Sequence, residues 1–153
     1  MGGAAALPLL LCVAACTTNS QAGDTPTLLR FLPPEQGGPA ALPEASPSGI
    51  IDLSGPCVRL QLDPGRSRVV ISTHDSNVGQ DIRGIYVEFH GRRFRHGTHV
   101  KGGGGGIDRL PADPLDAPVP EACGAGPFLI FHSVREFDPT KVPPPRSPPP
   151  PIG

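Results

Sequence analysis

The chain has 153 residues, with 13 Lys and Arg against 14 Asp and Glu, and a formal net charge of −1. This balance excludes a globally basic nucleic-acid-binding protein and a strongly acidic solvating tail. Pro and Gly number 22 and 20, about 27% of the residues, a share at which sequence without a period is usually low-complexity or disordered. We therefore expect a single domain that occupies only part of the chain.

An uncharged apolar stretch, AAALPLLLCVAA, runs from Ala4 to Ala15. It is too short to cross a bilayer, because a transmembrane helix needs about 20 apolar residues. Its length and the small residues at its end are typical of a secretory signal peptide, although the first basic residue is Arg30. We expect residues 1–15 to form a signal peptide.

The four residues that close this stretch, Val13-Ala14-Ala15-Cys16, resemble the lipobox of bacterial lipoproteins. In that family the signal peptide is cut before the cysteine, whose sulfur receives diacylglycerol and whose new amine is usually acylated. The resemblance implies that Cys16 is lipidated and that membrane lipid is a partner of the protein. Because Thr17 is not Asp, it also implies sorting to the outer membrane, facing the periplasm. Two or three acyl chains hold a protein stably, whereas one chain holds it only marginally. The alternatives to a lipoprotein signal peptide are the plain cleavable signal of a secreted protein and a buried apolar segment.

Pro-rich segments flank the middle of the chain. Residues 16–49 contain the expected lipidated cysteine and six prolines, a composition that predicts a semi-extended tether. The apolar cluster Leu28, Leu29, Phe31 and Leu32 within it is expected to form one helical turn or to dock on the domain. Residues 138–153 end in PPPRSPPPPIG and predict a disordered polyproline II tail. This tail is expected to be a solvated spacer, with a ligand for an aromatic groove as the alternative.

Short runs of apolar residues fill the region 50–137 and predict β-strands without an amphipathic helix. The predicted strands span residues 57–62, 69–71, 85–89, 92–95, 98–100 and 128–131. Turns are predicted at Asp63-Pro64-Gly65 and at Asp75-Ser76-Asn77. The strand at 128–131 is apolar on both faces, so we expect it to be the most buried. The predicted fold is mainly β, a small antiparallel β-barrel or sandwich of five to six strands.

The chain has four cysteines: Cys12, Cys16, Cys57 and Cys123. If the resemblance holds, Cys12 leaves with the signal peptide and Cys16 carries lipid, which leaves an even pair. In an oxidising periplasm this pair is expected to form a Cys57–Cys123 disulfide. Two buried free thiols are the alternative. A metal site is disfavoured because neither cysteine has a Cys or His within four residues.

The segment from His90 to Lys101, HGRRFRHGTHVK, combines four cationic residues with three histidines and no carboxylate. The cationic residues are Arg92, Arg93, Arg95 and Lys101. On a strand, Arg93 and Arg95 lie on the same face, opposite Phe94. Such a stripe predicts binding of an anionic envelope component, a glycan, a lipid headgroup or a protein. The alternative is an ordinary solvated face balanced by nearby acidic residues, and nucleic acid is not expected as a partner.

The histidines and the glycine run of this region could indicate a metal site or a phosphate-binding loop. His90, His96 and His99 lack a known ligand spacing, so no metal or cofactor is expected. The five glycines at 102–106 follow Lys101 instead of preceding a lysine, which excludes a P-loop. They predict a flexible or bulged connection, or a close approach of backbones.

Ser72, His74 and Asp75 are close in sequence, but neighbouring strand residues point to opposite faces and do not form a relay. No Gly-x-Ser-x-Gly nucleophile motif is present, and we expect no enzymatic activity. The sequence therefore predicts a lipid-anchored cell-envelope protein of structural or interaction type. The alternative is a periplasmic binding module that recognises an anionic envelope component through the Arg92–Lys101 segment.

Overall fold

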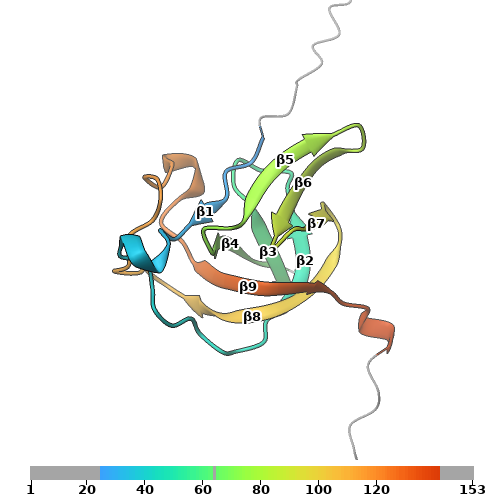
Figure 1. Ribbon diagram of the computed structural model, residues 1–153. Coiled ribbons are helices and arrows are strands. Elements are labelled where there is room, and N and C mark those ends of the chain that lie inside the picture. The colour runs from blue at the N-terminus through green and yellow to red at the C-terminus, as the bar shows by residue number, and fades with distance from the viewer. Residues whose placement is uncertain (1–24, 64, 142–153) are drawn as a thin grey trace, which may run out of the picture.

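The computed structural model describes residues 25–63 and 65–141, which form nine strands and three short 3₁₀ helices (Figure 1). The expected signal peptide, Cys16 and most of the Pro-rich tail lie outside these residues. No helix in the described part of the chain is long and apolar enough to span a bilayer. The strands are β1 (Leu29–Arg30), β2 (Ser48–Asp52), β3 (Arg59–Asp63), β4 (Arg66–Ser72), β5 (Asn77–Asp81), β6 (Gly84–Phe89), β7 (Arg92–Arg95), β8 (His99–Ile107) and β9 (Phe128–Glu136). The 3₁₀ helices are η1 (Pro34–Gln36), η2 (Glu121–Cys123) and η3 (Pro139–Lys141).

Five strands close into a barrel in the order β4-β3-β2-β8-β9, because β9 also pairs with β4. Neighbouring strands are antiparallel except β4 and β9, which pair in parallel from Val69↔Phe128 to Ile71↔Ile130. This connectivity is that of the OB-type five-stranded Greek-key barrel. The predicted mainly β fold and the barrel are confirmed, and closure leaves no free edge along the barrel strands.

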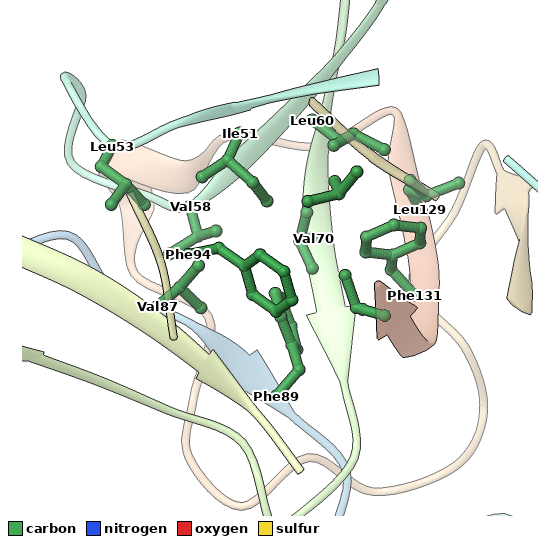
Figure 2. Close-up of a cluster of buried hydrophobic side chains, with 12 residues drawn as sticks. Ile51, Leu53, Val58, Leu60, Val70, Val87, Phe89, Phe94, Leu129 and Phe131 are labelled. Carbon is green, nitrogen blue, oxygen red and sulfur yellow. The ribbon is translucent and has the colours of Figure 1, made fainter. Parts of the chain in front are cut away.

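The remaining strands form an antiparallel sheet in the order β5-β6-β7, inserted in the chain between β4 and β8. Its buried face contributes Val87, Phe89 and Phe94 to the same apolar cluster as the interior of the barrel (Figure 2). The Phe89 ring centre lies 6.0 Å from the ring centres of both Phe94 and Phe131, edge-on to the latter. This small sheet therefore packs on the barrel and shares its core.

A second apolar cluster lies on the outside of β4 and β9. Along β9, Leu129 and Phe131 join the barrel interior, whereas Phe128 and Ile130 join the outer cluster with Val69 and Ile71 of β4. All residues from Phe128 to Phe131 are at most 8% exposed, so this strand is buried as predicted. It is not the most buried strand, because Val69, Val70 and Ile71 of β4 are each 0% exposed. A strand covered on both faces has no solvent side, which explains its continuous apolar run.

The N-terminal segment covers this outer cluster. β1 pairs in parallel with the end of β4 at Leu29↔Ile71, and both Leu29 and Phe31 are buried. Further along, Ala45 forms a β-bridge with Gly104. Of the two expectations for the apolar cluster at 28–32, docking on the domain is the one that the structure shows. The packed part of the chain thus reaches back to Pro26, through much of the segment expected to be a tether.

The five glycines at 102–106 lie within β8 and not in a loop. The bulge predicted for them is present, between Lys101 and Gly103 in the pairing with β9. The close backbone approach is present too, because a Cβ atom on Gly104 would overlap the carbonyl oxygen of Ile130. Gly104 also has φ of 154°, a value that residues with side chains rarely adopt. Glycine here lets the barrel bend and close.

Candidate functional site

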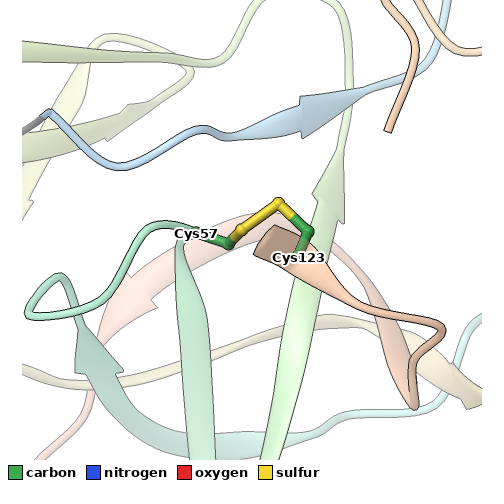
Figure 3. Close-up of a disulfide and its surroundings, with 2 residues drawn as sticks. All are labelled: Cys57 and Cys123. Atoms are coloured by element: carbon green, nitrogen blue, oxygen red, sulfur yellow. A yellow bond between two sulfur atoms is a disulfide. The ribbon is translucent and has the colours of Figure 1, made fainter. Parts of the chain in front are cut away.

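Cys57 and Cys123 form a disulfide, with Cα atoms 5.6 Å apart (Figure 3). This separation lies within the usual range for a bridge, so the predicted pairing is confirmed. Both residues are buried in the outer cluster. The bond joins the connection between β2 and β3 to η2, which lies between β8 and β9. Two segments 66 residues apart in sequence are thereby fixed to each other.

The start of the described chain is held beside this disulfide. Thr27 forms a parallel β-bridge with Cys57, and its backbone N–H donates to the carbonyl of Pro56 at 2.8 Å. The N–H of Val58 in turn donates to the carbonyl of Thr27 at 2.9 Å. The disulfide, the residues around it and the N-terminal segment therefore form one packed unit.

The predicted cationic stripe lies on the solvent face of the small sheet. The pairing of β6 with β7 sets Arg93 opposite Glu88 and Arg95 opposite Tyr86, on the same face. Arg93 Nε donates to Glu88 Oε2 at 2.9 Å, and its guanidinium lies 4.4 Å from the centre of the Tyr86 ring. Arg95 Nη2 donates to both carboxylate oxygens of Asp81 at 2.8 Å. The placement of the two arginines on one face is as the sequence predicts.

These contacts pair the two arginines with carboxylates from neighbouring strands. The hydrogen bonds from Arg95 and from a backbone N–H lower the pKa of Asp81, and the hydrogen bond from Arg93 lowers the pKa of Glu88. Each carboxylate is therefore held in its charged form. The segment 90–101 itself lacks carboxylates, but the register of the sheet supplies them from β5 and β6.

The other two predicted cations have different surroundings. Arg92 is exposed, and its side chain makes no ion pair or hydrogen bond with residues 25–63 and 65–141. Lys101 belongs to β8 in the barrel, and its ammonium lies 5.7 Å from the centre of the Phe137 ring. Of the four predicted cations, Arg92 is therefore the one to which the described residues supply no partner.

The histidines have separate neighbours. His90 Nδ1 contacts Asp75 Oδ2, and His96 Nδ1 accepts a hydrogen bond of 3.1 Å from the N–H of Leu53. His132 Nε2 lies 3.0 Å from the carbonyl oxygen of Pro43. Among the described residues, no three His, Cys, Asp or Glu side chains gather as metal ligands would.

Ser72 is buried, and its hydroxyl donates to the carbonyl of Phe131 at 2.9 Å. The same hydroxyl lies 2.9 Å from that of Ser76, which is also buried. Ser72 therefore links β4 to β9 by a buried hydrogen bond. His74 and Asp75 lie exposed in the following turn.

A groove that the sequence does not predict lies where β9 ends. A hollow of about 440 Å³ is lined mainly by apolar groups, including Ile50, Leu62 and Phe137. It adjoins a more polar hollow of about 760 Å³, and His99, Phe137 and Pro139 line both. The lining residues come from β2, β3, β8 and the chain after β9, and the pairing of these strands brings them together.

Comparisons with protein-family models, with curated proteins and with solved structures find no match to this chain. Function is therefore inferred from the cysteines, the charged sheet and the groove of this chain alone. A fold by itself does not identify a function, since one barrel type carries many unrelated sites.

Proposed function

We propose that this chain is a lipid-anchored protein of the bacterial cell envelope, held in the outer membrane by acylated Cys16. The β-barrel faces the periplasm, and its role is structural or interaction-based, without catalysis. The observation that carries this proposal is the buried Cys57–Cys123 disulfide. Disulfides persist in oxidising compartments such as the periplasm and are rare in the cytosol. The disulfide therefore agrees with the export that the lipobox-like residues at 13–16 imply.

The groove beside Phe137 supports an interaction role. Its lining is largely apolar, with Gln61 and His99 as polar groups that orient a bound segment. Figure 1 shows the chain after β9 leaving at the end of the molecule opposite the start of the described chain. A protein anchored through its N-terminal segment would thus hold this groove away from the membrane, where other envelope proteins can reach it.

The second candidate function is recognition of an anionic envelope component through the Arg92–Lys101 segment. It is favoured by Arg92, which is exposed and unpaired within the described part of the chain. Arg93 and Arg95 favour it less, because Glu88 and Asp81 already neutralise them. If this function holds, Arg92→Glu abolishes retention on anionic liposomes. An unchanged retention supports the interaction role instead.

The proposal is tested by growing cells with radiolabelled palmitate. The label is expected on the mature chain and is expected to disappear in Cys16→Ser, which should move to the soluble fraction. Cys12→Ser is the matched control, because a cysteine in the signal peptide is removed before the mature protein forms. An unlabelled mature chain, or a Cys16→Ser chain that stays in the membrane, would refute lipidation at Cys16. Crosslinking in intact cells with mass spectrometry then identifies the partner.

A further inference from the structure

The turn between β5 and β6 presents a completely exposed isoleucine. Ile82 is the most exposed large apolar side chain in the described part of the chain. Single exposed apolar residues are common on protein surfaces and need no explanation on their own. Ile82 differs from such residues in two ways. It lies at the tip of the projecting β5–β6 hairpin, and this hairpin lies toward the same end of the molecule as the N-terminal segment (Figure 1).

The base of this tip is firmly held. Arg95 donates to both carboxylate oxygens of Asp81 at 2.8 Å and to the carbonyl of Gly84 at 3.0 Å, so it clamps both sides of the turn. The N–H of Arg83 donates to Asp81 Oδ1 at 2.8 Å. The side chain of Arg83 has no partner among residues 25–63 and 65–141. The turn thus holds one apolar and one cationic side chain together in solvent.

The hairpin tip and the N-terminal segment lie toward the same end of the molecule (Figure 1). The connection after β2 links the two. In this connection, Leu53 and Ser54 line a hollow of about 500 Å³ together with Arg83 of the hairpin. The carbonyl of Pro56 in the same connection accepts a hydrogen bond from the N–H of Thr27. η3, the last described element, lies toward the opposite end.

The length of chain before Thr25 limits how far this end can lie from a lipid surface. Thr25 is nine residues beyond Cys16, and nine residues span at most about 30 Å when fully extended. β5 has five residues and is about 17 Å long. Val78 of β5 and Ile85 of β6 pack against the barrel core, so the tip projects by part of this length into the gap of at most about 30 Å between this end and the lipid.

We propose that the β5–β6 hairpin contacts the membrane that carries the acylated Cys16. Ile82 enters the boundary between headgroups and acyl chains, and Arg83 meets a lipid phosphate. This inference rests on the proposed lipid anchor. Together the two side chains raise membrane affinity by roughly ten- to a hundred-fold, which orients the barrel without anchoring it. The groove beside Phe137 then faces away from the lipid.

The chain contains no tryptophan, so Ile82→Trp introduces a unique fluorescent probe at the tip. The full-length acylated protein is reconstituted into vesicles of phosphatidylethanolamine and phosphatidylglycerol with brominated acyl chains. We expect a blue-shifted emission and at least two-fold quenching relative to unbrominated vesicles. The matched control is Thr140→Trp, an exposed position at the opposite end, whose emission is expected to stay unquenched. Adding Arg83→Glu to Ile82→Trp is expected to reduce the quenching.

Palmitate labelling of the same samples separates this inference from the lipid anchor. A labelled protein that is quenched at position 82 and not at position 140 supports the membrane contact. A labelled protein whose probe at 82 stays solvent-like overturns the contact and leaves the anchor standing, and equal quenching at both positions overturns it as well. An unlabelled mature protein overturns the proposed function, and the inference falls with it.

Discussion

Opening the Cys57–Cys123 disulfide is expected to lower the free energy of unfolding by about 4 kcal/mol. The two cysteines are 66 residues apart, and a loop of that length restricts the unfolded chain by roughly 15 cal/mol/K in the chain-entropy description. At 25 °C this amounts to about 4.3 kcal/mol. Small domains are stable by roughly 5–15 kcal/mol, so the loss is a large share of the total.

Comparing reduction with mutation separates the stability contributed by the covalent loop from the stability contributed by packing of the two sulfur atoms. Reduction opens the loop but leaves both sulfur atoms in the outer cluster. The double variant Cys57→Ala/Cys123→Ala opens the loop and also removes the two buried atoms, which adds about 1–2 kcal/mol. We therefore expect the double variant to be less stable than the reduced chain by that further amount.

The measurement is urea unfolding at 25 °C of purified chains in which Cys12 and Cys16 are replaced by serine, so that no other thiol can exchange. The m value is expected to rise when the loop is opened, because the unfolded chain then exposes more surface. A reduced chain within about 1 kcal/mol of the oxidised chain, with the same m value, would refute the reasoning from loop length.

Two further changes test the barrel and the small sheet. Gly104→Ala is expected to lower the free energy of unfolding by more than about 3 kcal/mol in urea unfolding, because the new Cβ would overlap the carbonyl of Ile130. The control Gly124→Ala has open space around the new Cβ and is expected to lower the free energy of unfolding by about 1 kcal/mol. Similar losses at both positions would contradict this. Hydrogen bonds from Arg95 lower the pKa of Asp81, so their pairing stabilises the fold above about pH 4 and is lost as the pH falls through the lowered pKa. Asp81→Asn should therefore lower Tm at pH 7, and the deficit should shrink as the pH falls below about 4. A deficit of the same size at pH 7 and at pH 2 would contradict the assignment.

Strands with alternating apolar residues could be predicted from the sequence. Strands that lack this pattern, and that form only because they pair with neighbouring strands, could not. The segments 85–89 and 92–95 have clear patterns, and both appear as strands with the buried residues on the expected face. β2 begins with Ser48-Gly49, and β8 contains five glycines, so neither has an intrinsic strand pattern. These segments become strands because each is a central strand of the sheet with two hydrogen-bonded neighbours, β3 and β8 for β2, and β2 and β9 for β8.

The same distinction applies to the candidate sites. The disulfide could be predicted because the four cysteines divide into two near the N-terminus and two in the domain. The ion pairs of Arg93 and Arg95 could not, because they depend on the register that sets Glu88 and Asp81 beside them. The groove beside Phe137 also depends on tertiary structure, since its walls come from distant strands.

The position of the disulfide determines how the domain responds to a mechanical load between its two ends. A pull on the N-terminal side first peels β1 and then β2 away before it reaches Cys57, where tension passes through the sulfur–sulfur bond to Cys123. Everything between these cysteines, from β3 to β8, lies inside a covalent loop and bears no direct tension. A load between the two ends would therefore extend β1, β2 and β9 and spare the three barrel strands inside the loop, β3, β4 and β8, from forced unravelling.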